Sequence, residues 1–503
     1  MLSPRAKSFI TKLRSYLLIS ALTFTSAIYA EKYQHIEQSE LNTLNQTNSL
    51  EAFHRAFDMG DELFEHTFLT SEGAGANIGN GQLMSLVPRA DLNLIDQWAG
   101  HLPKRVTGPN AQSCEACHGV PFGDGAGKVV MNNVRDPLRT GDIGQFITRQ
   151  PTHMFGIGAL QLLAEEMSDE LHQQRQRMIA QAAIHSQTVI APLTAKGINF
   201  GSISVDADGH IDTSRVIGLD LDLIVKPLEW KGVGSNVRDF VRSASNNELG
   251  LQSTELVGAD VDADYDGVNN ELSVGDITAL VIYQAAQPRP TTLLELSGLG
   301  LIERLKKDHD SQIRLGKELF NSTKCSSCHT PRMTLNNPVY SEPSRHPGYR
   351  DQIFPAGQDP VSEGLALAKA ISFDLTKDLP DNIIELENGK KIHLGNFKKD
   401  SNGATIVELY GDLKRHDMGV ALAESIDEVG TGAANFITKE LWGVGSTAPY
   451  LHDGRATTLD EAIVLHGGEA EMAKQNYLEL AHSDKNALVA FLKNLVLFKL
   501  EQE

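Results

Sequence analysis

The sequence predicts a mainly α-helical fold of two related domains, with a small β insertion in the first domain. A motif of the form CxxCH occurs twice, at residues 114–118 and 325–329, and one domain around each copy explains the repeat. Apolar side chains recur at helical spacing in segments such as residues 49–68, which predicts amphipathic helices. Between about residues 197 and 225, and most clearly in residues 198–205, β-branched side chains alternate with small or polar ones, which predicts a strand pair.

Both CxxCH motifs have the form of a c-type haem attachment site, in which two thiols become thioethers and the histidine binds the iron. A zinc site would need four convergent ligands, and neither zinc nor a thiol redox pair explains a histidine after each pair of cysteines. The two motifs use all four cysteines of the chain. We therefore predict two covalently bound c-type haems, with their iron, in two cytochrome c-like haem domains. The predicted haem-binding residues are Cys114, Cys117 and His118 in the first site and Cys325, Cys328 and His329 in the second.

The N-terminus has the pattern of a secretory signal peptide. Four basic residues and no acidic one precede an apolar run at residues 16–28, and small residues lead to Ala30, after which cleavage is expected. No later stretch reaches about 18 uninterrupted apolar residues, so we expect a mature protein that does not span a membrane. We predict that residues 1–30 are a signal peptide and that the mature protein is periplasmic, because c-type haem is attached outside the cytoplasm.

The net charge of the chain limits the classes of partner that we expect it to bind. Removing the four basic residues of the predicted signal peptide changes the formal net charge from -20 to -24. We expect no nucleic-acid partner, because nucleic-acid binding relies on basic residues that neutralise phosphates. An acidic surface attracts a basic protein such as a small donor cytochrome, although acidity can also serve solubility alone.

The predicted domains divide the chain near its middle. With 503 residues, of which 41% are hydrophobic, it is long enough for two or three domains. The prolines of residues 287–290 cannot continue a helix and mark the predicted boundary. We predict an N-terminal cytochrome c-like domain at residues 31–290 with the first haem and a C-terminal one at residues 291–503 with the second. Residues 313–320 predict the helix before the second haem site, and residues 334–360, rich in Pro, Ser and Asn, predict a surface loop.

Two further segments recur in both halves of the chain. Residues 154–158 (MFGIG) are similar to residues 441–445 (LWGVG), and residues 228–232 (LEWKG) are similar to residues 450–454 (YLHDG). An internal duplication explains both similarities. The first copy then carries an insertion at about residues 163–226.

An acidic segment precedes a helix predicted at residues 273–286. Asp262, Asp264 and Asp266, followed by a glycine, reproduce the DxDxDG opening of a calcium-binding loop, in which oxygen ligands stand at alternate positions. The twelfth position, where such a loop carries glutamate, is Ser273. Two interpretations therefore stay open, a weak calcium site and a solvated acidic turn.

Several segments together resemble one family. Besides both CxxCH motifs they are residues 149–158, 230–231, 247–250, 266–280, 416–419 and 450–469. They resemble the bacterial di-haem cytochrome c peroxidase and MauG superfamily and, within it, the di-haem oxidoreductase family of peroxidase-like proteins. Rubber-cleaving di-haem oxygenases are more distantly similar. The resemblance covers roughly residues 110–500.

The resemblance implies roles for two histidines near the second haem. His452 belongs to the HDG segment beside that haem, and His466 stands where these enzymes place its distal iron ligand, usually methionine in the peroxidases. Histidine on both faces implies a low-spin iron of lower potential than a His/Met pair gives. As alternatives, His466 could only cap the helix before it, with Met418 or Met472 as the ligand, and His452 could be a core histidine.

The resemblance also implies two catalytic residues. Trp230 is similar to a tryptophan that relays electrons between the haems, and Glu248 is similar to a distal carboxyl that moves protons during peroxide cleavage. Their alternatives are a core tryptophan and a solvated acid. Glu248 follows Trp230 two residues sooner than in the peroxidases. Between Gly119 and Thr152 there is no histidine to act as a distal ligand, so the first haem is expected to be open, as in MauG.

The function implied by the resemblance is that of a periplasmic di-haem peroxidase-like oxidoreductase. It would reduce hydrogen peroxide at the open N-terminal haem, with electrons relayed through the C-terminal haem from a small cytochrome c, a cupredoxin or a quinol. One alternative is oxygenation or MauG-like oxidation of a macromolecular substrate. The other is a pure di-haem electron-transfer cytochrome with two six-coordinate irons.

Overall fold

The fold is described over most of the chain. The predicted signal peptide, residues 1–30, lies outside the described residues, as does part of the segment between the first CxxCH motif and Thr152. From His35 onward the chain forms one compact unit, and the domain boundary near residue 290 stays a prediction. None of the helices described is both long enough and apolar enough to cross a membrane. The computed structural model describes residues 33–75, 85–86, 104–105, 111–127, 132–135, 145–386 and 388–499.

Helices are the larger part of the regular structure. Of the described residues 37% are helical and 15% lie in strands, so the predicted excess of helix is confirmed, but the fold is mixed rather than mainly α. The α-helices are α1 (Gln38–Thr47), α2 (Ser49–Glu65), α4 (Ile157–His185), α5 (Val237–Leu249), α6 (Thr254–Val257), α7 (Val274–Ala285), α8 (Leu293–Leu299), α9 (Lys307–Ser322), α10 (Leu459–Leu465), α11 (Glu471–Leu478) and α12 (His482–Asn494). The 3-10 helices are η1 (Thr70–Glu72), η2 (Cys325–Ser327), η3 (Pro347–Tyr349), η4 (Leu367–Lys369), η5 (Val444–Ser446) and η6 (Gly468–Ala470).

The strands form small antiparallel sheets of two or three strands each. The sheets are β1 with β2, β3 with β4, β5 with β6 and β7, β8 with β18, β9 with β15 and β14, β10 with β11, β12 with β13, and β16 with β17. In the first half the strands are β1 (Ser85–Leu86), β2 (Lys104–Arg105), β3 (Asn132–Arg135), β4 (Phe146–Arg149), β5 (Val189–Ala195), β6 (Ile198–Val205) and β7 (Ile211–Asp212). In the second half they are β8 (Thr291–Thr292), β9 (Met333–Leu335), β10 (Val339–Glu342), β11 (Ile371–Asp374), β12 (Ile383–Glu385), β13 (Lys391–His393), β14 (Lys398–Lys399), β15 (Thr405–Val407), β16 (Arg415–Asp417), β17 (Asn435–Ile437) and β18 (Leu495–Val496).

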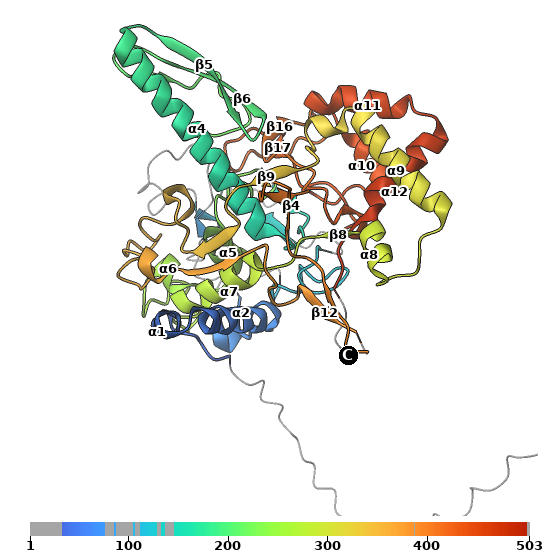
Figure 1. Cartoon of the computed structure of the whole chain (residues 1–503). Coiled ribbons are helices and arrows are strands. Elements are labelled where there is room, and N and C mark those ends of the chain that lie inside the picture. The colour runs from blue at the N-terminus through green and yellow to red at the C-terminus, as the bar shows by residue number, and fades with distance from the viewer. Residues whose placement is uncertain are drawn as a thin grey trace, which may run out of the picture. The chain divides into compact units, whose positions relative to one another are not determined.

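Helices α2 and α7 pack together in the first half (Figure 1). The Asn48 side chain accepts a hydrogen bond from the Glu51 amide and so caps the start of α2. At Gly60 the two helix backbones approach so closely that a Cβ atom would lie 2.2 Å from the Ala279 carbonyl oxygen. Phe64 follows one turn later, buried, with its ring 6.1 Å from the ring of His118. The first haem motif therefore lies against the α2–α7 pair, at Phe64.

Helices α9 and α12 repeat this arrangement in the second half, on the right of Figure 1. A Cβ atom at Gly316 would lie 1.9 Å from the Ala487 carbonyl oxygen. Phe320, again one turn later and buried, lies 6.4 Å from the ring of His329, measured between ring centres. The helix predicted from residues 313–320 is thus confirmed as part of α9. Each CxxCH motif follows a helix that contacts its partner through a glycine.

The prediction that residues 334–360 form a surface loop is wrong. This stretch contains part of β9, all of β10 and η3, and the side chains of Tyr340 and Tyr349 are almost fully buried. Its serines are not solvated, because Ser344 donates a hydrogen bond to Glu165 Oε1 at 2.7 Å. Pro343 and Ser344 are both buried, so this part of the stretch is not an exposed loop.

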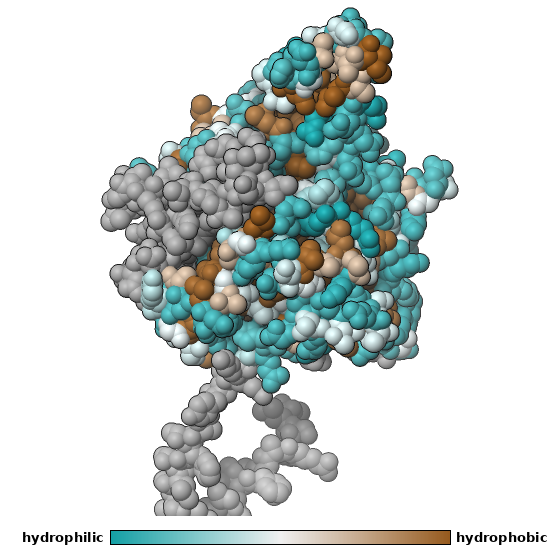
Figure 2. Space-filling model, turned by 90° about the vertical axis from the view of Figure 1, so that its left-hand side faces the viewer, coloured by the Kyte–Doolittle hydropathy of each residue, from teal (hydrophilic) through white to brown (hydrophobic). Residues whose placement is uncertain are grey.

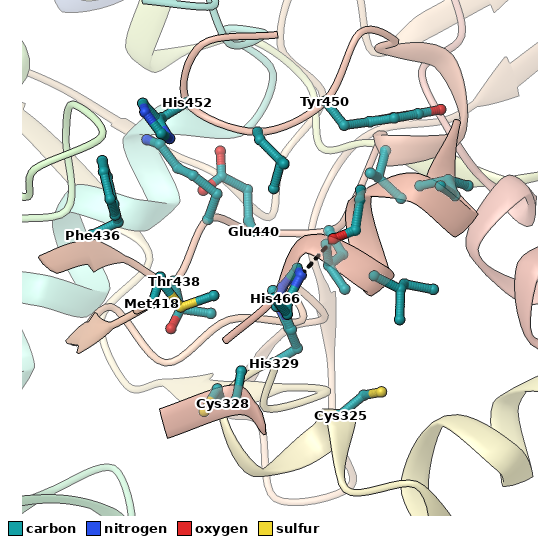
Figure 3. A pocket seen from close by; sticks show the side chains of 18 of the residues that line it. Cys325, Cys328, His329, Met418, Phe436, Thr438, Glu440, Tyr450, His452 and His466 are labelled. Atoms are coloured by element: carbon teal, nitrogen blue, oxygen red, sulfur yellow. Dashed lines mark hydrogen bonds between the residues drawn. The ribbon is translucent and has the colours of Figure 1, made fainter. Parts of the chain in front are cut away.

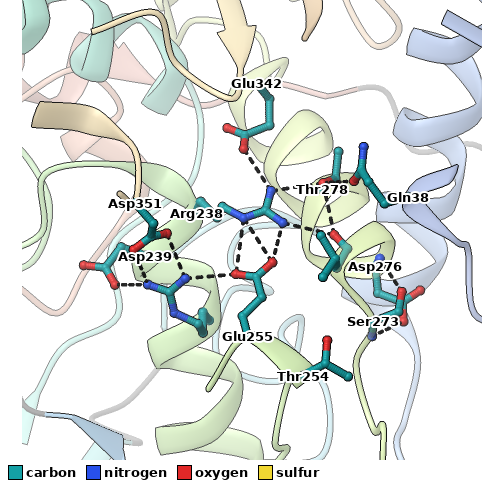
Figure 4. Close-up of polar contacts among 12 residues, drawn as sticks. Gln38, Arg238, Asp239, Thr254, Glu255, Ser273, Asp276, Thr278, Glu342 and Asp351 are labelled. Carbon is teal, nitrogen blue, oxygen red and sulfur yellow. Dashed lines mark hydrogen bonds and ion pairs between the residues drawn. The ribbon is translucent and has the colours of Figure 1, made fainter. Parts of the chain in front are cut away.

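A buried ionic network joins this stretch to the first half of the chain (Figure 4). Arg238 on α5 donates to Glu342 of β10 at 2.9 Å and forms an ion pair with Glu255 of α6. The neighbouring Arg242 donates to Glu255 and to Asp351, at 2.9 and 3.0 Å. Breaking one partner of such a network leaves an unpaired buried charge, so the two halves are tied together at α5.

The insertion forms an arm that projects from the body, made of α4, β5 and β6 (Figure 1). The strand predicted at residues 198–205 is confirmed as β6. Its main partner is β5, which precedes Gly197 rather than following it, and only the two-residue β7 pairs from the other side. The arm exposes the apolar side chains of Ile184 and Ile190, and apolar atoms are visible at its tip in Figure 2.

Candidate functional site

The first CxxCH motif lies in a short irregular segment against α2. The Nδ1 atom of His118 donates a hydrogen bond to the Thr152 carbonyl oxygen at 2.7 Å, which fixes the tautomer and leaves Nε2 as the free nitrogen. Burial lowers the pKa of His118, so the ring is neutral, as a metal ligand must be. His118 and Cys117 line a cavity of about 150 Å³. This donor set fits a covalently attached haem.

The second CxxCH motif lies at η2 and lines a larger cavity of about 250 Å³. The Nδ1 atom of His329 donates to the Tyr410 carbonyl oxygen at 3.1 Å. Across the cavity, the Nδ1 atom of His466 donates to the Ala462 carbonyl oxygen at 2.7 Å (Figure 3). Burial lowers the pKa of His466, and burial and the nearby His466 lower that of His329 to about 4. Both rings are neutral with Nε2 free.

The spacing of these two rings tests whether one iron fits between them. Their centres are 6.5 Å apart. An imidazole nitrogen binds a transition metal at about 2 Å, and its ring centre lies about 1 Å further, so two rings on opposite sides of one metal have centres about 6 Å apart. His329 and His466 fit this arrangement. Met418 and Met472 also line the cavity, but the Met472 side chain is 66% exposed.

Trp230 lies between the two cavities and lines both. Its Nε1 donates to the Gln150 carbonyl oxygen at 2.8 Å, and its own carbonyl oxygen accepts from the Ile437 amide at 3.0 Å. The His452 ring is 6.5 Å from the Trp230 ring and stacks on Phe436 at 4.3 Å, measured between ring centres. The sequence-predicted residues Trp230 and His452 are therefore brought together at the junction of the two sites.

A buried charge cluster surrounds His452. Glu424 forms an ion pair with Arg149, and its Oε2 lies 3.6 Å from Lys231 Nζ. Burial, with the positive charges of Arg149, Arg455 and Lys231, lowers the pKa of His452 to about 4 against the opposing effect of Asp453. His452 is therefore neutral. Glu424 was missed in the sequence because no motif or spacing marks it, and only the fold brings it to the arginine and lysine.

The turns that carry Trp230 and His452 have the same backbone. In the first, Leu228 and Gly234 form the bridge, in which the Leu228 amide donates to the Gly234 carbonyl oxygen at 3.1 Å, with positive φ at Glu229 (64°) and Gly232 (60°). In the second, Tyr450 and Ala456 form the bridge, with positive φ at Leu451 (72°) and Gly454 (68°). The positive angles fall at the same two positions of both turns. The turns thus support the predicted duplication and place Trp230 and His452 at equivalent positions.

The helices after the two turns start at equivalent positions too. Asn236 caps α5 by accepting from the Asp239 amide at 2.9 Å, and Thr458 caps α10 by accepting from the Glu461 amide at 3.2 Å. Each cap follows the first residue of its turn by eight residues. His466 follows Thr458 by eight residues, and the residue eight after Asn236 is Ala244.

Ala244 therefore occupies, in the first half, the position of His466 in the second. It lines the cavity of His118 just as His466 lines the cavity of His329. An alanine offers no ligand atom. The sequence alone did not indicate it, because an alanine in a helix belongs to no functional motif. Its position becomes informative only when the two turns are aligned in space.

Glu248 lies on the same helix, one turn after Ala244, and lines the same cavity. Helix α5 continues to Leu249, whereas α10 ends at Leu465, directly before His466. Burial and the nearby Glu248 carboxylate raise the pKa of the Cys117 thiol to about 11, which places this carboxylate near the attachment point of the first haem. In the first half, the Glu248 carboxyl therefore lies one helical turn after Ala244, the position that is equivalent to His466 in the second half.

The three aspartates of the predicted calcium loop also lie together. Asp262, Asp264 and Asp266 each offer an oxygen, and these atoms lie within 4.8 Å of one another. This loop joins α6 to α7.

Comparison with known proteins gives one family match. No curated protein matches the chain. Among solved structures, a MauG-like protein associated with microbial copper homeostasis aligns with a TM-score of 0.27 and 16% identity, over 58% of this chain and 78% of that chain. Hydrazine synthase of Kuenenia stuttgartiensis aligns with a TM-score of 0.29 and 13% identity, over 98% and 100%. Residues 395–495 match the family described as "Di-haem oxidoreductase, putative peroxidase". The predicted resemblance to this family is therefore confirmed over residues 395–495, the segment that contains His452 and His466.

Proposed function

We propose that the protein is a periplasmic di-haem c-type oxidoreductase that reduces hydrogen peroxide at the first haem. His118, with Cys114 and Cys117, would hold that haem, and His329 and His466, with Cys325 and Cys328, would hold the second. When bound, the first haem supplies an iron that can take up hydrogen peroxide and give it two electrons. The location in the periplasm is supported by the pattern of residues 1–30.

The observation that carries this proposal is Ala244. A pure electron carrier needs two six-coordinate irons, and the position that offers imidazole to the second iron offers only a methyl group to the first. A second haem held by both His329 and His466 would be suited to electron transfer, because the two imidazoles would leave its iron no place for a substrate. The asymmetry between the halves favours one reactive haem and one electron-transfer haem.

Glu248 is the proposed proton-transfer residue. Splitting peroxide into two water molecules takes up two electrons and two protons, and a proton must move from the inner to the outer oxygen as the bond between them breaks. A carboxyl can perform this transfer as a general acid–base catalyst when it lies within reach of the peroxide. Its place in the cavity, one turn beyond Ala244, supports the role.

Trp230 and His452 are the proposed path between the haems. Trp230 lines both cavities, and its ring and that of His452 lie edge to face. Electrons would enter at the second haem from a small cytochrome c, a cupredoxin or a quinol. The acidic chain favours a basic donor protein through electrostatic steering.

The experiment that tests the proposal is to supply the missing ligand. In haem-loaded Ala244→His, the new imidazole should occupy the vacant position, and the reaction with hydrogen peroxide, followed by stopped-flow at the haem absorbance, should slow at least a hundredfold. The control is Ala244→Leu, which adds bulk without a ligand and should keep more of the activity. Equal rates in wild type and Ala244→His would contradict the proposal. A wild type that is inert to peroxide but binds dioxygen would point to the oxygenase alternative.

A further inference from the structure

The loop between α6 and α7 contains two buried carboxylate oxygens that lack partners. Asp264 is 0% exposed and Glu271 is 3% exposed. Among the described residues, neither Asp264 Oδ2 nor Glu271 Oε1 has a hydrogen-bond partner. Burying a polar group without a partner costs about 1 to 3 kcal/mol, and more for a charged group, so such atoms indicate a ligand.

The same loop has the geometry of a cation-binding turn. Asp262 Oδ1 accepts from the Tyr265 amide at 2.6 Å and its Oδ2 accepts from the Gly267 amide at 3.0 Å, which curls the chain around the carboxylates. The oxygens of Asp262, Asp264 and Asp266 then lie within 4.8 Å of one another. A loop that presents alternate oxygen ligands in this way is typical of calcium sites.

Ser273, at the twelfth position of the motif, is not available as a ligand. Its hydroxyl accepts from the Asp276 amide at 3.0 Å, as the cap of α7, and donates to the Ile36 carbonyl oxygen at 2.7 Å. The helix begins where a calcium loop of this type would place its last acidic ligand. The acid missing at Ser273 must come from elsewhere in the loop.

Glu271, two residues before Ser273, is a further acidic residue of this loop. Its Oε2 accepts from the Gln252 amide at 2.6 Å, and Gly73 lies against it so closely that a Cβ atom there would be 2.3 Å from the side-chain carboxyl carbon. The side chain is thereby held inside the protein. Gln252 also joins this side chain to the aspartate loop, because its Oε1 accepts from the Ala263 amide at 3.1 Å.

We propose that Asp262, Asp264, Asp266 and Glu271 bind one calcium ion, with Glu271 in place of the twelfth-position ligand. Calcium is favoured because it takes six to eight oxygen ligands in flexible geometry, whereas magnesium demands a near-ideal octahedron and keeps several waters. This site is independent of peroxide chemistry and of both haems. It would fasten the loop to α7 and to the segment at Gly73.

A second cluster in the chain serves as a control. Asp206, Asp208 and His210 also bring their ligand atoms within 4.8 Å. Asp206, however, is satisfied by the amides of Asp208 and His210, at 3.0 and 2.9 Å, and the cluster has no buried residue. We expect no tight calcium binding there.

The test is calcium titration of the haem-loaded protein after treatment with a chelator and buffer exchange. Isothermal calorimetry should show one calcium ion per chain in wild type and in Asp208→Asn. Glu271→Gln and Asp264→Asn should weaken binding at least tenfold, and magnesium should bind more weakly than calcium to wild type. Absence of calcium binding to wild type, or unchanged affinity in Glu271→Gln, would overturn the proposal.

A thermal-unfolding measurement guards against misfolded variants. Glu271→Gln replaces a buried carboxyl oxygen that lacks a hydrogen-bond partner with an amide group, so in chelator the variant should be at least as stable as wild type. Calcium should raise the unfolding temperature of wild type and of Asp208→Asn but not that of Glu271→Gln. A calcium-induced rise in Glu271→Gln as large as that of wild type would contradict the role of Glu271.

Discussion

Ala244 and His466 occupy equivalent positions in the two halves of the chain. His466 offers an imidazole nitrogen to the second haem site, whereas Ala244 offers no ligand atom to the first. The imidazole was predicted as a ligand from its resemblance to a known family, and its hydrogen bond to Ala462 leaves the correct nitrogen free. The alanine could not be recognised from sequence, because its meaning depends on the match of two turns and two helix caps. The lack of a ligand at this position of the first half can be recognised only when the equivalent positions of the two halves are aligned in space.

At this scale, Glu248 is the residue whose chemistry is most directly testable. Haem-loaded Glu248→Gln should react with hydrogen peroxide at least about 100-fold more slowly than wild type, because the amide cannot move a proton between the two oxygens. Both haems should stay attached, as judged by mass. Glu170→Gln on the projecting arm is the matched control and should react at the wild-type rate. If Glu248→Gln also reacts at that rate, the assigned role is wrong.

Asp124 makes a pH-dependent contribution to stability. Burial raises the pKa of its carboxyl to about 7, against the effects of Lys499 and Tyr283. Because this folded-state pKa lies above the ordinary pKa of an aspartate, the contribution is fully present below about pH 4 and is lost as the pH rises towards 7.

Asp124→Asn, which stays neutral, isolates this contribution. The free energy of unfolding of wild type minus that of the variant should fall by about 1 to 2 kcal/mol between pH 5 and pH 7. Denaturant unfolding of the haem-loaded proteins at both pH values measures the difference. A difference that does not depend on pH would show that the Asp124 carboxyl keeps an ordinary pKa.

At the scale of elements, the sequence predicted what local pattern controls. The helices at residues 49–68 and 273–286 were expected from apolar spacing and are found as α2 and α7, within a few residues at each end. β6 was expected from its alternation. Its partner β5 was misplaced, because pairing depends on the hairpin direction rather than on the pattern within one strand. Residues 334–360 were misread because their polar side chains find buried partners supplied by distant segments.

The close helix contacts give an element-scale prediction. Gly316→Ala places a Cβ atom 1.9 Å from the Ala487 carbonyl oxygen, so α9 and α12 must separate. We expect a loss of more than about 2 kcal/mol in the free energy of unfolding. Gly298→Ala in α8 is the control, since nothing lies within 4 Å of its added Cβ, and it should be neutral or stabilising by up to about 1 kcal/mol. Equal effects of the two changes in denaturant unfolding would contradict the close packing.

At the scale of the whole molecule, the two halves are interleaved rather than simply joined. Residues of β10 and η3 pack on the helices of the first half, and the Arg238 network spans both (Figure 4). The number of haem motifs could be read from the sequence, whereas this interleaving could not, because the ion pairs of Arg238 with Glu342 and of Arg242 with Asp351 join residues more than a hundred positions apart.

Trp230→Phe tests the proposed path between the haems. The variant should still bind peroxide at the first site, but electrons from the second haem should arrive more slowly. Stopped-flow oxidation of a protein reduced only at the second haem would measure the rate. Trp442→Phe is the matched control, since Trp442 lines the second cavity but not the first, and it should transfer electrons faster than Trp230→Phe. Unimpaired transfer in Trp230→Phe would exclude this tryptophan from the path.

The central claim is that one iron has a vacant axial position and the other has two histidines. Electron paramagnetic resonance of the oxidised, haem-loaded wild type tests it most directly. We predict one high-spin and one low-spin ferric signal of equal intensity, with the low-spin signal converted to high spin in His466→Gly and restored by added imidazole. Two low-spin signals in wild type would contradict the account, because they would mean that a residue other than Ala244 closes the first haem.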